Sequence, residues 1–579
     1  MPEIEVPLQR TVPSHATTSA RWILWTSFFL GLPALIPLAG ALIVPYLNGM
    51  VPTGFIEYDM PYYYAEGRAY FDRGFQLTYS NPYAGYNSPA IYFQPQTFLL
   101  GVLHKLGIAP GVSFNLFGLA ALFFAAVAAV IFYAEFVGVE TTSKKIGLLC
   151  FFWGGGIFTL WGVGRALFRM HRFSAVFEVE PTYGWWMLNY GRNLVYPLEA
   201  FYHGLFLFAL LALMRRRLAL SLALATVLCI SHPFTGVSLI LTLIAYSGVE
   251  LVLRSGVVKL WFMIGAMIVA ALDVAYYLVF LNRFTDHRVL QQQWEHAWVH
   301  SPLPWLYPPK TFVAALILVG VLAIWRLATP VSGLSQLEAT RLKSMRPAGN
   351  IDLQNSRKSP RLHWIRSSSF FRYLRDPRVR LFLVMFVVVF ALTQHNLVIR
   401  PMQPIHFAHG YDWTALFFLG APVLIGLIDS ILKLSRPIAR YGALALLLGL
   451  FLLDNAAWLV KIAIDNEFIV SLTKDEDGAL NWLSKNARPG DLVICQDEML
   501  SYLVPTYSPA LAWQGHLKNT PYLGLRHDEV ERVFNQGQAL PEWKRHGVIY
   551  VSPATWVPPA DLSLERRYAN SDLAIWATP

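Results

Sequence analysis

The chain has 579 residues, of which 55% are hydrophobic and 14% are charged, and its net charge is +10. Soluble domains carry roughly 25% charged residues, so this composition argues against an ordinary soluble enzyme and indicates a protein that crosses a membrane several times. The positive charge then belongs to basic cytoplasmic loops, because no fold motif or aromatic interleaving supports nucleic-acid binding. The three cysteines share no motif spacing, so neither a disulfide framework nor a cysteine-based zinc motif is predicted.

Residues 1–21 are predicted to form a polar cytoplasmic tail. Arg10 and Arg21 precede the first apolar run, residues 22–46, and basic residues on that side place the N-terminus in the cytoplasm. The run is long enough to cross the hydrocarbon and too long for the core of a cleaved signal peptide, so we interpret it as a retained anchor. Residues 47–88 then form the first outer loop.

Residues 22–464 are predicted to be an all-α membrane domain of about eleven spans. The direction of each span follows from groups of basic residues that belong in the cytoplasm, such as Lys144-Lys145 and Arg215-Arg216-Arg217. The expected spans are 22–46, 112–135, 146–164, 199–214, 218–231, 234–253, 260–281, 311–327, 381–399, 413–433 and 441–463. Residues 89–107 do not fit this count, so we expect a re-entrant or surface-lying helix there; the alternative is a true span.

Two segments outside the spans have distinct compositions. Residues 328–380 are predicted to be a basic cytoplasmic loop that contacts anionic lipid head groups. Residues 465–579 contain a helix-like stretch at 475–486, which Pro489-Gly490 stops, and short β-rich runs at 491–495 and 547–551. This pattern predicts a small α/β domain, and the odd number of spans places it on the extracytoplasmic side.

Two carboxylates follow the first span closely. Glu57 and Asp59 are one residue apart and precede the aromatic cluster Tyr62-Tyr63-Tyr64. Carboxylates are costly inside lipid, whereas Tyr favours the boundary between lipid and water. The stretch is therefore either an interfacial aromatic belt with solvated acids, or a surface segment that holds two carboxylates for chemistry.

Polar residues gather in the predicted outer loops, where arginine runs against the positive-inside bias. A guanidinium group binds phosphate through two parallel hydrogen bonds. We therefore predict phosphate or substrate binding by Arg192 in the loop 165–198, by four residues of the loop 394–412, and by one tyrosine of the first loop: Arg400, Gln403, His406, His409 and Tyr63.

Histidine spacing raises the question of a metal. His406 and His409 would share one face of a helix, but the sequence fixes no third ligand, and Pro404 argues against a regular helix before His406. Hydrogen bonding to a phosphate or to a polar core is the favoured interpretation. His232, in Ser231-His232-Pro233 between two spans, is interpreted as a capping or interhelical hydrogen-bond partner rather than a catalyst.

Acids at an outer surface beside a basic, aromatic-rich wall suit sugar transfer from a polyprenyl-phosphate sugar. The phosphate leaving group needs no strong general acid, but its charge needs Arg, His or a metal. The acceptor hydroxyl needs one carboxylate base.

Three features resemble the GT-C glycosyltransferases: the pair Glu57-Tyr58-Asp59 at the start of a long first outer loop, the stretch 87–92, and the tail. The tail carries Asn481-Trp-Leu, Pro489-Gly-Asp-Leu-Val, Gly515-His516 and Thr520-Pro521 before Arg526. That superfamily includes protein O-mannosyltransferases, aminoarabinose transferases and oligosaccharyltransferases. The resemblance implies a multi-pass enzyme of the inner (plasma) membrane with a polyprenyl-phosphate sugar donor and an extracytoplasmic acceptor. It also implies that Asp59, supported by Glu57, acts as the base or holds a divalent cation such as Mg²⁺ or Mn²⁺.

The sequence lacks the Trp-Trp-Asp triplet of oligosaccharyltransferases, which favours transfer of a single sugar. Two other classes stay open. A transporter or flippase would also have many spans, although such proteins usually show internal repeats, and none is found here. A non-catalytic scaffold whose α/β domain binds a partner is the third interpretation.

Overall fold

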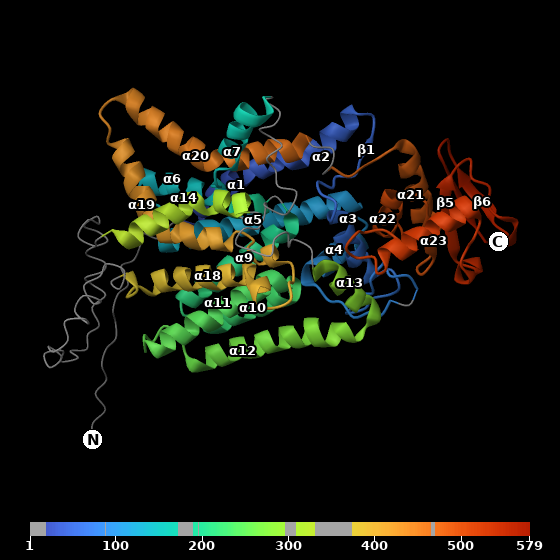
Figure 1. Ribbon diagram of the computed structural model, residues 1–579, viewed down its shortest axis with the longest axis horizontal. Coiled ribbons are helices and arrows are strands. Elements are labelled where there is room, and N and C mark those ends of the chain that lie inside the picture. The colour runs from blue at the N-terminus through green and yellow to red at the C-terminus, as the bar shows by residue number, and fades with distance from the viewer. Residues whose placement is uncertain are drawn as a thin grey trace, which may run out of the picture.

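A long helical bundle makes up one end of the molecule, and the residues after 469 form a mixed α/β unit at the other end (Figure 1). The computed structural model describes residues 19–86, 88–171, 189–194, 196–295, 309–329, 373–464 and 469–578. Most of the predicted tail 1–21 and of the basic loop 328–380 lies outside the described residues, so both of these assignments stay predictions.

Proline sets where many bundle helices begin. Its fixed φ and missing N–H suit the first helical position, and seven helices start with it: α4 (Pro95–Lys105), α5 (Pro110–Phe136), α9 (Pro197–Met214), α11 (Pro233–Val252), α14 (Pro309–Ala328), α18 (Pro377–Thr393) and α20 (Pro437–Ile464). The others are α1 (Ala20–Gly31), α2 (Leu35–Leu47), α6 (Thr142–Trp153), α7 (Phe158–Arg165), α8 (Tyr190–Asn193), α10 (Leu218–Ser231), α12 (Leu260–Val274), α13 (Thr285–Glu295) and α19 (Tyr411–Leu432).

A membrane-spanning helical domain is confirmed, whereas the number of spans is only partly borne out. Within the described residues, seven helices are long and apolar enough to cross a membrane, or eight if the bent pair α6 and α7 counts as one span. The predicted spans 218–231 and 311–327 coincide with shorter apolar helices. The segment 89–107 contains only α4, whose 11 residues extend for about 16 Å, about half of the hydrocarbon thickness. This length agrees with a surface-lying helix.

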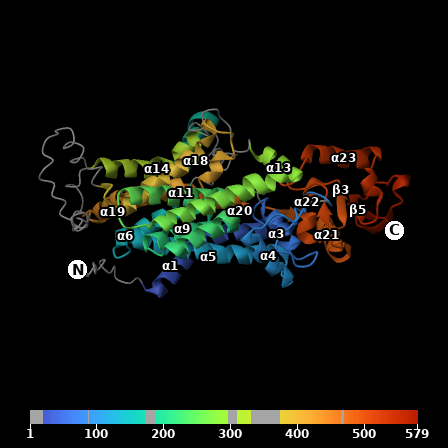
Figure 2. The same cartoon turned by 90° about the horizontal axis from the view of Figure 1, so that it is seen from below.

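Helix α3 (Met60–Ala69) packs against α4 at the boundary between the bundle and the α/β unit (Figure 2). Their backbones meet at Gly67 and Gly101, where a Cβ on Gly101 would lie 2.2 Å from the carbonyl oxygen of Gly67. Any larger side chain at either position would push the two helices apart. This contact fixes the helix that follows directly on Asp59.

The α/β unit contains the helix and both strands predicted from the sequence. The unit has a five-stranded sheet of order β4-β3-β5-β7-β6. Three helices pack with it: α21 (Lys474–Asn486), α22 (Glu498–Tyr507) and α23 (Leu523–Gln536). Strands β4 (Leu511–Ala512) and β5 (Val548–Pro553) pair in parallel with β3 (Leu492–Cys495), and β7 (Leu573–Ala577) pairs antiparallel with β5 and β6 (Glu565–Ala569). A separate short pairing joins the unit to the segment after α2, between β1 (Val51–Pro52) and β2 (Ser471–Leu472).

Candidate active site at the junction of the two units

Asp59 is the residue just before α3, and its carboxylate makes no capping hydrogen bond to that helix. Its side chain is 46% exposed, and Oδ1 lies 2.6 Å from Nε2 of His516, a residue of the α/β unit. The described part of the chain offers no hydrogen-bond donor to Oδ2. The carboxylate is therefore fixed through one oxygen and accessible through the other.

The hydrogen bonds around His516 determine which of its ring nitrogens can donate to Asp59. Its Nδ1 lies 3.2 Å from the backbone N–H of Lys518 and 2.9 Å from the side-chain amide of Asn519, so Nδ1 accepts. In a neutral imidazole the other nitrogen then carries the proton, and Nε2–H donates to Asp59. The ring of His516 stacks with those of Tyr58 and Tyr62, with centroid distances of 5.0 and 4.8 Å.

Glu57 has a different role from its neighbour. Its Oε2 accepts the backbone N–H of Asp59 at 2.9 Å, which closes a tight turn. Burial, and after it the charge of Asp59, raises the pKa of Glu57 well above its usual range. Burial and the neighbouring acid thus favour the protonated form of Glu57, while the side chain of Asp59 is the more accessible of the two.

Tyrosines fasten this segment to α22. The hydroxyl of Tyr502 accepts the backbone N–H of Tyr62 at 3.0 Å and donates to the carbonyl oxygen of Tyr58. The hydroxyl of Tyr58 in turn accepts the backbone N–H of Leu517 at 3.2 Å. Tyr63, predicted as a substrate contact, is partly buried, and its ring centroid lies 4.7 Å from that of Tyr62.

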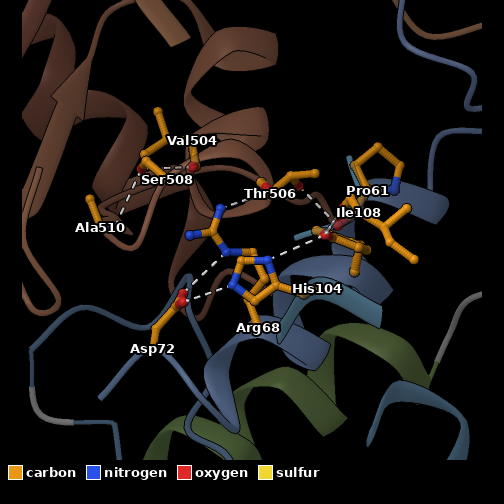
Figure 3. Close-up of polar contacts among 10 residues, drawn as sticks. Pro61, Arg68, Asp72, His104, Ile108, Val504, Thr506, Ser508 and Ala510 are labelled. Carbon is orange, nitrogen blue, oxygen red and sulfur yellow. Dashed lines mark hydrogen bonds and ion pairs between the residues drawn. The ribbon is translucent and has the colours of Figure 1, made fainter. Parts of the chain in front are cut away.

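A second set of polar contacts holds the other end of α3 (Figure 3). Asp72 joins Arg68 and His104 at 3.2 Å each, which ties α3 to α4. Arg68 also donates to the carbonyl oxygen of Thr506 at 3.1 Å, and the Thr506 hydroxyl donates to the carbonyl oxygen of Pro61. Because buried charged groups are costly unless paired, this network makes the contact between α3 and α22 specific, and it keeps His516 in register with Asp59.

Histidines and an intramembrane acid form a second cluster, defined here as Glu199, His232, His406 and His409. Nδ1 of His406 lies 3.2 Å from Nε2 of His409, and Oε2 of Glu199 lies 2.8 Å from Nδ1 of His409. Burial lowers the pKa of His409 to about 3, so its imidazole is neutral. The charge of Glu199 is among the causes that raise the pKa values of Glu57 and Tyr63, which places the cluster within electrostatic reach of the acidic pair.

The backbone around the cluster is unusual. Gln403 and His409 both have positive φ, 43° and 38°, a conformation uncommon outside glycine that concentrates at functional sites. Gly410 follows with φ 72°, and a Cβ there would lie 2.6 Å from the backbone of Asn189. The segment 403–410 is therefore held in a shape that its own sequence does not favour, against the residues that precede α8.

The predicted phosphate-binding residues do not converge on one point. Arg192 is 1% exposed, and its Nε donates to Asn455 of α20 at 2.8 Å, with Asp454 at 3.7 Å. Its charge is therefore already engaged inside the protein. Arg400 is exposed, whereas Gln403 is buried. Phosphate binding by these residues, and by His406 and His409, stays a prediction.

Sequence reasoning gave no role in the site to two of its members, although it noted His516 as part of the family resemblance. His516 lies far from Asp59 in the chain, in a tail without a catalytic motif, so no local pattern pointed to it as an Asp59 partner. Glu199 carried a signal that was overlooked, because an acid inside an apolar span is a functional candidate by default. His232 was interpreted as a hydrogen-bond partner, and its Nδ1 does lie 2.8 Å from the hydroxyl of Thr235.

No protein-family model and no curated protein matches the chain. Among solved structures, a similar one is ArnT from Cupriavidus metallidurans in the apo state, with 12% sequence identity, a TM-score of 0.42, and coverage of 96% of this chain and 97% of that one. At this TM-score and identity, the chemistry has to come from the residues of this chain.

Proposed function

We propose that this protein is a membrane glycosyltransferase of the GT-C type, which transfers a single sugar from a polyprenyl-phosphate donor to an extracytoplasmic glycan, lipid or protein. The observation that carries the proposal is the Asp59 carboxylate, fixed by His516 through Oδ1 and accessible through Oδ2, beside a membrane-spanning bundle. A lipid-linked sugar presents its anomeric carbon at such a boundary, with its tail in the bilayer.

Asp59 would act as the general base. Its accessible oxygen accepts the proton of the acceptor hydroxyl, and the new glycosidic bond forms as the bond to the donor phosphate breaks. The leaving phosphate is already acidic, so no proton donor is required for it. Nε2–H of His516 donates to the other oxygen and fixes the carboxylate, which is the positioning that general-base catalysis requires.

The divalent cation predicted at Glu57 and Asp59 is not used in this mechanism. Oε2 of Glu57 is taken up by a backbone N–H, and Oδ1 of Asp59 by His516. Within the described residues, the one group of three or more histidine, cysteine or acidic side chains that could hold a metal does not include either acid. A cation at the pair would need ligands from the substrate.

The activity is tested with membranes that contain the chain and a radiolabelled polyprenyl-phosphate sugar. We expect label to move from the lipid into a fraction that no longer extracts with it, and polyprenyl phosphate to appear in equal amount. Membranes from cells without the chain provide the background. Donors with pentose and hexose head groups are compared, since single-sugar transfer is expected with one class. A chain that only moves the intact donor between leaflets would contradict the proposal and support a flippase.

The orientation follows from the same proposal: the N-terminus lies in the cytoplasm and the α/β unit outside it. Reporter fusions at Ser344, in the basic loop, and at Ser508, at the end of α22, should report opposite sides of the membrane. The basic loop belongs inside because of its Lys and Arg content. Reporters on the same side would place Asp59 away from an extracytoplasmic acceptor and would contradict this part of the proposal.

A further inference from the structure

Three histidines from separate segments meet in the cluster. His232 lies between α10 and α11, His406 belongs to the short 3₁₀ helix Pro404–Phe407, and His409 precedes α19. One ring nitrogen of each lies within 4.8 Å of those of the other two. Within the described ranges, no other group of three histidine, cysteine or acidic side chains comes together in this way.

Spacing within the cluster matches that of a metal site. Zinc–imidazole bonds of 2.0–2.1 Å in a tetrahedron place neighbouring ligand nitrogens about 3.3–3.4 Å apart. Nδ1 of His406 and Nε2 of His409 are 3.2 Å apart. These two atoms therefore need almost no movement to share an ion, and the His232 ring needs a shift on the order of 1 Å from the 4.8 Å limit.

The remaining ring nitrogens face suitable partners. A histidine that binds a metal commonly directs its other nitrogen at a carboxylate, carbonyl or water. Nδ1 of His409 faces Oε2 of Glu199 at 2.8 Å, and neither atom has a hydrogen-bond partner of good geometry within the described residues. Nδ1 of His232 lies 2.8 Å from the Thr235 hydroxyl and accepts the backbone N–H of Thr235 at 3.3 Å. Zinc binding at Nε2 therefore moves the ring proton to Nδ1, where it can be donated to the hydroxyl.

We propose that His232, His406 and His409 bind one zinc ion, with Glu199 orienting the ring of His409. Imidazole ligands suit zinc and neighbouring transition metals, whereas Mg²⁺ and Ca²⁺ require oxygen ligands. Three protein ligands leave the fourth tetrahedral position to a water molecule or an anionic oxygen. The ion takes the place of the hydrogen bond between His406 and His409, and the proton of the donor ring moves to its other nitrogen, so each imidazole stays neutral. The ion also links the outer ends of α10, α11 and α19.

The test is the metal content of the full-length chain, purified in detergent from a tag-free or tag-cleaved preparation, because a polyhistidine tag would itself bind zinc. After equilibration with zinc and removal of the excess, we expect about one zinc per chain in the wild type. The double variant His406→Ala/His409→Ala should hold less than a tenth of that amount. His287→Asn is the matched control, because His287 is also a buried histidine but lies on α13 outside the cluster, and it should bind zinc as the wild type does.

Two further measurements keep the proposal falsifiable if the double variant fails to fold. X-ray absorption at the zinc edge of the wild type should show nitrogen and oxygen ligands with imidazole scattering and no sulfur. Glu199→Gln should weaken zinc affinity by about 10–100-fold in competition with a fluorescent chelator, the usual effect of losing such a partner. A wild type that holds no zinc, equal zinc in the double variant, or sulfur ligation would overturn the proposal. None of these results depends on sugar transfer.

Discussion

Asp59→Asn is expected to lower the rate of sugar transfer by roughly 10²–10⁴-fold, the usual contribution of a general base. The substitution keeps the size of the side chain and its contact with His516, but the amide cannot accept the proton of the acceptor. Because the side chain is 46% exposed and outside the packed core, protein level and donor binding should stay close to those of the wild type. The measurement is the initial rate with labelled donor at saturating acceptor.

Substitutions of two neighbouring residues distinguish the role of Asp59 from the roles of the residues that hold it. His516→Asn removes the donor to Oδ1, so kcat should fall while the KM for the donor changes little, and by less than in Asp59→Asn. Glu57→Gln keeps the side-chain carbonyl that accepts the Asp59 N–H, and it mimics the protonated form that burial favours, so its effect should be the mildest. Full activity of folded, membrane-inserted Asp59→Asn would contradict the catalytic role and support the interfacial belt.

Much of the fold could be predicted from local patterns. Apolar runs and basic loops anticipated the long helices, because length and hydropathy are properties of a single segment. The α/β unit was also predictable, since its helix α21 has a capping box at Thr473 and Glu476, and Pro489-Gly490 follows its end. The broken region 142–170 was less predictable, because the 67° bend between α6 and α7 depends on tertiary packing.

Prediction of the site was less complete, because its parts come from distant segments. Asp59 could be proposed from its position after a span, but its partner His516 comes from the other unit, and nothing in the sequence fixes that pairing. The histidine cluster shows the same limit. The sequence offered His406 and His409 without a third ligand, and Pro404 argued against a regular helix; the structure has a short 3₁₀ helix there and brings His232 beside it.

The histidine cluster also depends on how α11 and α18 are held at their other ends. Helix α11 begins directly after His232, and α18 leads to the segment that carries His406. Far from these ends, Glu250 of α11 and Arg380 of α18 form a two-pronged ion pair, with Nε–Oε1 and Nη2–Oε2 distances of 2.5 and 2.7 Å. The two side chains are 0% and 8% exposed, so this pair and the cluster fix opposite ends of two packed helices.

Arg380→Met should therefore destabilise the protein by roughly 3–5 kcal/mol, because it leaves the buried Glu250 charge without its partner. The measurement is the midpoint of thermal unfolding in detergent, followed by fluorescence. Arg375→Met is the matched control, since Arg375 lies nearby in the chain but is exposed, and it should change the midpoint little. The double variant Arg380→Met/Glu250→Leu should recover most of the loss, because an apolar pair of similar volume carries no unpaired charge.

If Arg380→Met unfolded like the Arg375 control, the pair would have no part in holding α11 against α18. A double variant as unstable as the single one would instead show that the loss comes from packing, since Arg380 also donates to the carbonyl oxygen of Leu374 at 2.7 Å.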